Sequence, residues 1–200
     1  MANTYTIVIT RSFGSLGRPI ARKLSEILNI EYYDRDIVDE TSKNLGLPVS
    51  VVSDEEETAK SGFLNMIYPL GSGTTIQQDK IFDEQAKIIR NLAEKASCII
   101  VGRCADYILE NEKNCMRVYI SAAYEDRLRN CIDVLGMTPE NGKKMIAKVD
   151  KARESYHQHY AGYQPSDIGH QDLIINSSML GINGTAQCLA AIAKERFHLN

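Results

Sequence analysis

The sequence predicts an α/β protein in which a parallel β-sheet is flanked by helices on both faces. Short apolar runs rich in β-branched residues, from Ile7–Ile9 near the start to Leu173–Ile175 near the end, alternate with segments of helical periodicity. Strands separated by helices pair in parallel through right-handed crossovers, which place helices on both sides of the sheet.

Length and charge limit the possible architecture and partners. With 200 residues, the chain can form one domain with a sizeable core, so we expect a single domain over residues 1–200. The formal net charge of −3 gives no overall reason to bind nucleic acid. No apolar run approaches the roughly 20 residues that span a bilayer, and no basic-then-hydrophobic leader is present. We expect a cytoplasmic monomer or homodimer that binds no membrane.

The cysteines predict reduced thiols. Their number is odd, and none has the CxxC spacing of a zinc or redox site, so packed thiols are favoured over a disulfide framework. The five positions are Cys98, Cys104, Cys115, Cys131 and Cys188. We expect no metal site built from cysteine.

The first element is a strand that leads into a glycine-containing loop and a helix. After Ile7–Ile9 the loop continues to Arg18, and Pro19 is expected at the first helical position. Backbone N–H groups and the positive end of the helix dipole would converge there, while Gly14 and Gly17 let the backbone approach a ligand. A Walker A loop would end in Lys-Ser/Thr, so Arg18 is a departure from that motif, but the geometry still predicts a phosphate site.

The next elements carry clear boundary signals. Glu31–Tyr33 predicts a short strand, and Asp34 is placed to cap a helix through about Leu45. Ser53 and Glu56, three residues apart, match a capping box of another short helix. Residues 61–75 predict a loop with exposed apolar side chains, which could be an oligomer contact, a substrate cover or part of the core. A long helix is expected from about residue 75 to 95.

The second half repeats the alternation. The expected elements, in order, are a strand at Cys98–Val101, a short helix through Leu109, a strand at Met116–Ile120, a helix from about Tyr124 to Leu135, a helix from Thr138 towards Tyr160, a strand at Leu173–Ile175 and a helix at Gly184–Phe197.

Arginines follow several of the predicted strands. Ligands of an open parallel sheet bind beyond the carboxyl ends of its strands. The stretches expected there are Arg11–Arg18, Tyr33–Arg35, Gly102–Arg103 and Asn176–Ser177. A guanidinium binds phosphate oxygens bidentately, so arginines from separate strands indicate a polyanion site. The alternative is that these arginines pair with nearby acidic residues on the surface.

Several segments together resemble the cytidylate kinase-like family, a branch of the P-loop nucleoside monophosphate kinases. The segments occur in the family's order and are residues 9–18, 32–35, 101–103, 149–153 and 172–177. The resemblance implies a five-stranded parallel P-loop fold, ATP with Mg²⁺ as donor, and a nucleoside monophosphate or other phosphorylated acceptor. It also implies an acceptor-binding insert at about residues 35–75 and a helical lid at about residues 138–165.

The resemblance also implies roles for particular residues. The expected donor site consists of Ser12, Phe13, Gly14, Ser15, Leu16, Gly17, Arg18, Pro19, Arg127 and Arg129. The expected acceptor site consists of Asp34, Arg35, Arg103, Asp150 and Arg153. Arg18, Arg103 and Arg153 would be the catalytic electrostatic clamps. Ile20 stands where the family's relatives carry a metal-binding threonine, so Ser15 or water would replace that ligand of Mg²⁺.

Other interpretations stay open. A non-catalytic, regulatory nucleotide- or phosphate-binding module would also lack the lysine and the metal-binding hydroxyl. A Rossmann dinucleotide enzyme fits poorly because the loop lacks G-x-G-x-x-G. We expect His157, His159 and His170 at solvated or lid-end positions, since 157 and 159 do not share a helix face. Tyr156, Tyr160 and Tyr163 could stack on a base or pack a loop.

Overall fold

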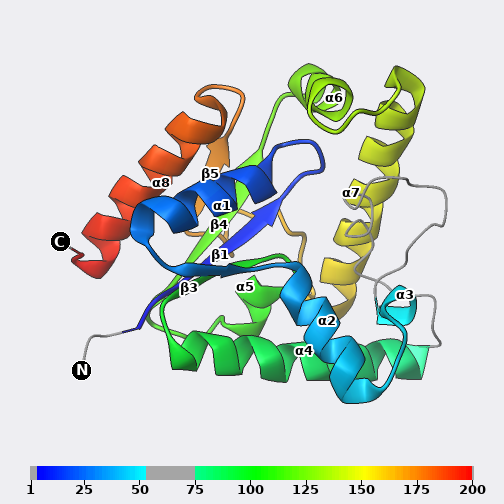
Figure 1. The fold of residues 1–200 in the computed structure, drawn as a ribbon, viewed down its shortest axis with the longest axis vertical. Coiled ribbons are helices and arrows are strands. Elements are labelled where there is room, and N and C mark those ends of the chain that lie inside the picture. Colours follow the sequence, from blue (N-terminus) through cyan, green and yellow to red (C-terminus); the bar gives the residue numbers. More distant parts are fainter. Residues whose placement is uncertain (1–3, 53–74, 200) are drawn as a thin grey trace.

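Five parallel strands form the centre of the protein. The structure is a computed structural model and describes residues 4–52 and 75–199 (Figure 1). The strand order is β2-β3-β1-β4-β5, as the alternation of strands and helices led us to expect for a parallel sheet. The strands are β1 Thr6–Arg11, β2 Glu31–Tyr33, β3 Cys98–Val101, β4 Cys115–Ser121 and β5 Leu173–Asn176.

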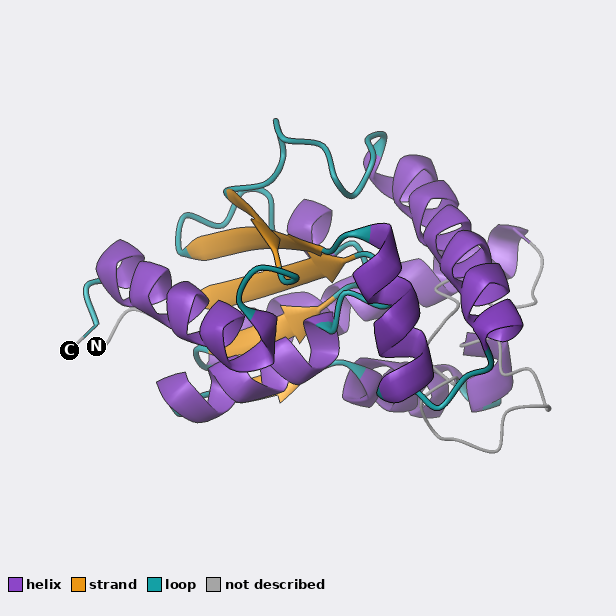
Figure 2. Ribbon diagram, turned by 90° about the horizontal axis from the view of Figure 1, so that it is seen from above, coloured by secondary structure: helices purple, strands orange, loops and turns teal. Residues whose placement is uncertain are grey.

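Helices cover both faces of this sheet (Figure 2). Their bounds are α1 Gly17–Leu28, α2 Arg35–Leu45, α3 Val49–Val52, α4 Thr75–Lys95, α5 Ala105–Ile108, α6 Tyr124–Asp133, α7 Pro139–Ala161 and α8 Gly181–Phe197. On one face, Ile7 and Ile9 of β1 pack with the apolar sides of α1 and α8. On the other, Val8 packs with α4 and α5. The period of two along a strand therefore divides the core into two layers.

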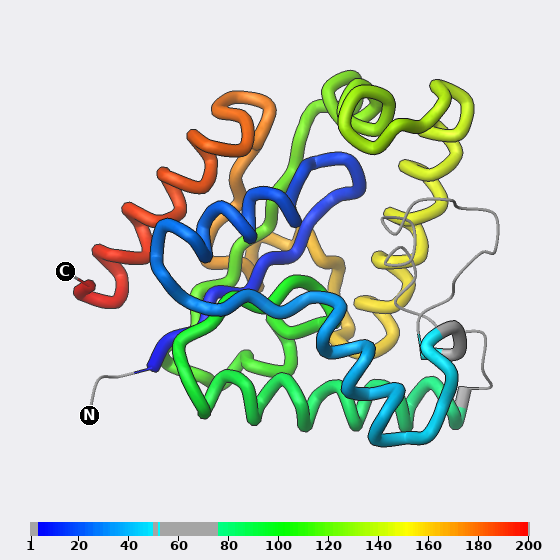
Figure 3. The backbone as a smooth tube through the Cα atoms, in the orientation of Figure 1, coloured from blue at the N-terminus to red at the C-terminus, as the bar shows by residue number. Residues whose placement is uncertain are grey.

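The strand register brings distant segments of the chain to one edge of the sheet. Ile9 pairs with Val101, the last residue of β3, while Arg11 pairs with Ile120 near the end of β4. Figure 3 shows the chain of β1 running between the segments that contain β3 and β4. The loop after β1 and the turn after β3 therefore lie next to each other at the carboxyl edge.

Two predicted helix starts differ from the structure. Helix α1 begins at Gly17 after a left-handed Leu16, so Pro19 is the third helical residue and not the first. The first four N–H groups of a helix have no partner within it, so proline costs nothing there either. Asp34 does precede α2, but its carboxylate makes no capping bond because Arg18 binds it. Helix α8 begins at Gly181, three residues earlier than expected.

Helix α7 begins as predicted. Thr138 Oγ1 accepts a hydrogen bond from the N–H of Asn141 at 3.3 Å, and Pro139 occupies the first turn. The capping box at Ser53 and Glu56 and most of the predicted loop at 61–75 lie outside the described residues.

The described residues contain neither a disulfide nor a helix that could span a membrane. All five cysteines lie there and are unbridged, four of them buried and Cys188 half-buried. No helix in residues 4–52 and 75–199 has the length and apolar character required to cross a membrane.

Candidate functional site

Hydrogen bonds of hydroxyl groups attach the loop between β1 and α1 to the carboxyl edge of the sheet. Ser15 Oγ donates to the carbonyl of Ser12 at 2.9 Å, and Ser12 Oγ lies 3.0 Å from the hydroxyl of Tyr119 on β4. Ser177, after β5, donates to the carbonyl of Ser15 at 2.8 Å. Three neighbouring strands therefore fix the path of the loop, which lets its N–H groups keep one arrangement.

The outer side of the loop is bound to α6 and α7. Arg127 Nε donates to the carbonyl of Phe13 at 2.7 Å, and Asn130 Nδ2 donates to that of Gly14 at 2.9 Å. The N–H of Phe13 donates to Asp150 Oδ1 at 2.8 Å, and Asp150 also pairs with Arg127. Arg127 and Asp150, expected at the donor and the acceptor, thus hold the loop in this structure.

Gly14 is required by this contact with α6. Its φ is +79°, and a Cβ atom there would lie 2.7 Å from the carbonyl oxygen of Arg127. The sequence suggested that this glycine admits a ligand. In the structure, Gly14 instead lets the loop approach the backbone of helix α6.

Arg18 points from α1 to the end of β2. Its Nε lies 2.7 Å from Asp34 Oδ2, and only 3% of the Asp34 side chain is exposed. Within the described residues, Asp34 Oδ1 has no hydrogen-bond partner. The neighbouring Arg35 instead lies on the surface of α2, where it pairs with Asp39 at 3.7 Å.

The turn after β3 holds Arg103 in an uncommon conformation. Gly102, Arg103 and Cys104 have φ values of +77°, +60° and +51°. A residue with a side chain in the left-handed region costs roughly 1–2 kcal/mol, and such strain gathers at functional sites. Arg103 is 7% exposed, and its buried Nη1 has no partner among the described residues.

Arg11, at the end of β1, lies among these charges. Loss of solvent, together with the positive charges of Arg103 and Arg18, lowers its pKa to about 10, although Asp34 opposes the shift. Its carbonyl accepts a hydrogen bond from Arg153 Nη1 at 3.0 Å. Burial and the charge of Arg11 also hold the pKa of Arg153 well below its usual value, with Asp150 and Asp34 opposing.

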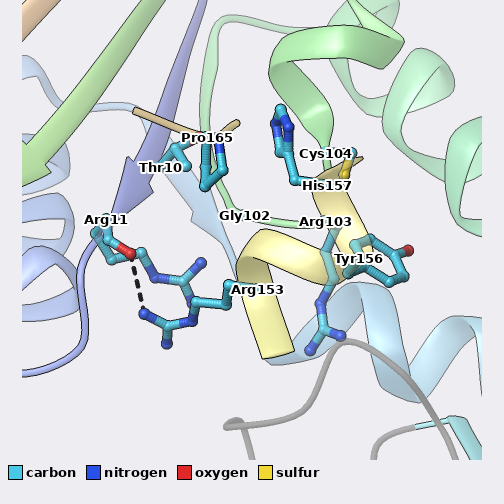
Figure 4. A pocket seen from close by; sticks show the side chains of 9 residues that line it. All are labelled: Thr10, Arg11, Gly102, Arg103, Cys104, Arg153, Tyr156, His157 and Pro165. Carbon is cyan, nitrogen blue, oxygen red and sulfur yellow. Dashed lines mark hydrogen bonds between the residues drawn. The ribbon is translucent and has the colours of Figure 1, made fainter. Parts of the chain in front are cut away.

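Two adjoining pockets open at this edge, and they share Arg11 and Arg153. The loop pocket is otherwise lined by Ser12, Phe13, Gly14, Leu16, Gly17, Arg18, Pro19 and Leu135. The strand pocket is otherwise lined by Thr10, Gly102, Arg103, Cys104, Tyr156, His157 and Pro165. Figure 4 shows Arg11 and Arg153 next to each other in the strand pocket, with His157 on its far wall.

His157 is buried near the end of α7, which corrects the expectation of a solvated position. Its Nε2 lies 2.8 Å from Asp106 Oδ2, and its Nδ1 lies 2.9 Å from the carbonyl oxygen of Tyr163. Both neighbours can only accept, so the ring carries two protons. Burial lowers the pKa of His157, but the hydrogen bond and charge of Asp106 more than offset it, and the net shift is upward.

Asp106 is a functional candidate that the sequence did not indicate. Its carboxylate is fully buried and also accepts from Tyr163 and Gln171, at 3.2 and 3.1 Å. The only indication of Asp106 in the sequence is that it lies in the short helix predicted after the strand β3. His159 and His170 do lie at exposed positions, His170 stacked on Tyr163.

Two of the tyrosines pack α7 against α4. Tyr160 stacks on Phe82 with ring centroids 4.0 Å apart, and the hydroxyl of Tyr156 donates to Gln85. The sequence left two alternatives for these tyrosines, stacking on a base or packing a loop. Tyr156 and Tyr160 both pack, but against helix α4, and Tyr156 also lines the strand pocket.

The chain matches a known protein family. Residues 6–179 match the model of the cytidylate kinase-like family. The chain belongs to this family. No curated protein matches the sequence.

Solved structures place this cytidylate kinase-like protein among the P-loop kinases by fold. An uncharacterized protein from Eubacterium ventriosum is 26% identical, with a TM-score of 0.70 over 96% of this chain and 98% of that one. The shikimate kinase of Acinetobacter baumannii is 11% identical, with a TM-score of 0.56 over 97% and 95%. A gluconokinase from Sinorhizobium meliloti is 11% identical, with a TM-score of 0.51 over 97% and 91%. At 11% identity the likeness concerns the fold, which confirms the predicted P-loop architecture.

The site of this family member brings together only part of the predicted set. The loop residues other than Ser15 line the two pockets, as do Arg18, Arg103 and Arg153, and Asp34 joins them through its ion pair with Arg18. Arg129 does not join them: its side chain is 66% exposed and pairs with Asp126 on its own helix. Arg11 joins them although it was predicted only as part of a strand-end stretch.

The described residues do not hold a metal ion by protein ligands alone. No three His, Cys, Asp or Glu side chains cluster among them, and Mg²⁺ in a kinase is bound mainly by substrate phosphates and water. Ile20 is fully buried, and the buried hydroxyl of Ser15 is bonded to the carbonyl of Ser12. The predicted replacement of the missing threonine by Ser15 therefore does not fit this geometry.

Proposed function

We propose that this cytidylate kinase-like protein transfers a phosphoryl group from ATP to a nucleoside monophosphate or another small phosphorylated acceptor. The observation that carries the proposal is the pair of pockets that meet at Arg11 and Arg153. Phosphoryl transfer needs two ligands aligned end to end with positive charge at the point where they meet.

The loop pocket suits the triphosphate. It lies at the N-terminus of α1, where the helix dipole favours an anion, and Arg18 lines it. Arg18 can bridge two phosphate oxygens through its planar fork, although it does not act as the compact point charge that a lysine would be. Its bond to Asp34 at 2.7 Å restricts the side chain to the pocket wall.

The strand pocket suits an acceptor that already carries negative charge. Three arginines line it, and none of its described lining residues is a carboxylate that could deprotonate a hydroxyl. The nearby His157 carries both ring protons and cannot serve as a base. A phosphate oxygen is ionised at neutral pH and needs no base, which favours a monophosphate over a neutral alcohol.

The chemistry then consists of one exchange of bonds. An oxygen of the acceptor phosphate bonds to the γ-phosphorus while the bond from that phosphorus to the bridging oxygen of ADP breaks. Arg18, Arg103 and Arg153 would bind the phosphate oxygens and stabilise the charge that develops on them.

The proposal is tested by transfer from labelled ATP, with magnesium in the buffer, to a panel of nucleoside monophosphates and small alcohols. Arg18→Ala should lower turnover about 100-fold. Arg22→Ala is the matched control, because Arg22 lies one turn further along α1 and is exposed. Absence of turnover with every acceptor would contradict the proposal.

A non-catalytic nucleotide-binding module is the second candidate, favoured by Arg18 and Ile20 at the positions where a lysine and a metal-binding threonine are expected. Calorimetric titration separates the two functions. ATP binding that depends on magnesium supports the kinase, whereas equal binding with and without magnesium, together with no turnover, supports the module.

A further inference from the structure

Arg11 has a position that neither the loop motif nor the predicted clamps explain. It is the last residue of the central strand β1, and it lines both the loop pocket and the strand pocket. A group at the junction of the two pockets would therefore lie beside this side chain.

The surrounding backbone is shaped to hold the Arg11 side chain. A Cβ atom on Gly17 would lie 2.8 Å from Cβ and Cγ of Arg11. A Cβ atom on Gly102 would overlap Nη1 of Arg11, and the three atoms nearest to that position all belong to Arg11. Two glycines from different elements therefore leave the space that Arg11 occupies, so its guanidinium is held in one place.

The charges around Arg11 favour an anion. Loss of solvent, together with the charges of Arg103 and Arg18 and against that of Asp34, lowers its pKa to about 10, so it still carries its proton at neutral pH. Asp34 already binds Arg18 at 2.7 Å. A second observation points the same way: Arg103 Nη1 is buried without a partner among the described residues. Buried cations in such excess are stabilised when a multiply charged anion enters.

We propose that Arg11 is a catalytic residue that binds the phosphoryl group in transit between the two pockets. This inference rests on the proposed function and adds a residue to it. The acceptor oxygen bonds to the γ-phosphorus as the bond to the ADP oxygen breaks, and Arg11 donates hydrogen bonds to the non-bridging oxygens throughout. Arg11 transfers no proton. Arg153, bound to the Arg11 carbonyl, lies beside it.

The two nucleotides of the donor site provide a test that needs no turnover. ATP carries the γ-phosphate and ADP does not, so a residue that binds this group contributes only to ATP binding. Calorimetric titration of the wild-type protein with each nucleotide, magnesium present, should show tighter binding of ATP. Arg11→Gln should reduce the ratio of ATP to ADP affinity about tenfold and leave ADP affinity nearly unchanged.

Two further variants complete the experiment. Arg11→Lys keeps the charge without the fork and should retain part of the ATP preference, which also provides a result if the glutamine variant does not fold. Arg117→Lys is the matched control: this strand arginine pairs with Asp172 and lines neither pocket. It should leave both affinities unchanged.

The possible outcomes separate the two proposals. If the wild-type protein binds neither nucleotide, the proposed function fails. If it binds both and the Arg11 variants keep the wild-type ratio, only the role of Arg11 is overturned. An equal loss of ATP and ADP affinity would also overturn it, because that result means a structural role in the loop.

Discussion

At the scale of single residues, Asp34 is the main counter-charge of the site. It lies at the end of β2, its side chain is 3% exposed, and it binds Arg18 while its charge also acts on Arg11 and Arg153. Because it makes no capping bond to α2, its role is electrostatic.

Asp34→Asn should therefore lower the free energy of unfolding by about 2 kcal/mol, since it leaves the half-buried Arg18 and Arg11 without their carboxylate. Asparagine is as good a helix cap as aspartate, so α2 itself is not weakened. Urea unfolding with and without pyrophosphate measures the effect, and pyrophosphate should stabilise the variant more than the wild type.

Asp39→Asn is the control for that experiment. Asp39 is exposed and pairs with Arg35 at 3.7 Å, so its loss should cost less than about 1 kcal/mol. Equal losses for the two variants would contradict a special role for Asp34.

The position of the arginines could be predicted from sequence, but their partners could not. Arg18 and Arg103 follow apolar strands, and the carboxyl ends of parallel strands meet at one edge. The space for Arg11 depends on Gly102, which is 91 residues away and adjacent only after β1 and β3 pair. The burial of His157 likewise depends on Asp106, whose carboxylate no local pattern marks as its partner.

At the scale of elements, α7 is attached to the rest of the protein by aromatic packing on α4 and by polar bonds at two places. Asp150 bonds to the loop before α1 and Arg153 to the end of β1, while His157 bonds to Asp106 on α5. The helix itself could be predicted, because Thr138 and Pro139 mark its start. Its attachments could not, because they depend on which face of α7 meets the sheet.

The pair at the end of α7 predicts a pH effect. The native pKa of His157 is raised, so its stabilisation is complete below the unfolded value of about 6.5 and decreases as pH rises through the native pKa. His157→Gln should be less stable by about 3 kcal/mol near pH 6, and the difference should shrink towards pH 8.5.

Urea unfolding of both proteins between pH 5.5 and 8.5 measures this difference. His170→Gln is the control, because His170 is exposed and stacks on the Tyr163 ring outside the buried pair. A difference between wild type and His157→Gln that stays constant with pH would mean that His157 is neutral in the native protein.

At the scale of the whole molecule, four of the five cysteines are buried, three of them in or next to the sheet and Cys131 between α6 and α7. Burial raises the pKa of Cys115 to about 12 and those of Cys98 and Cys131 to about 11. Only the thiolate reacts with alkylating agents, so these side chains should be inert while the fold is intact.

Iodoacetamide at pH 8 should therefore modify the native protein only at Cys188, whereas all five thiols should react in denaturant. Peptide mass spectrometry measures the sites. Modification of Cys98 or Cys115 in the native state would contradict the packing of the sheet, because both side chains are about 1% exposed.

The central position of β1 also has a consequence for protein synthesis. The phosphate loop lies within the first twenty residues, but β1 pairs with β3 and β4, which begin at residues 98 and 115. On the ribosome, the nascent β1 must remain without its neighbours until more than half of the chain has been translated, and such non-local pairing is slow. The loop between β1 and α1 is therefore among the first segments to be translated and among the last to reach its folded arrangement.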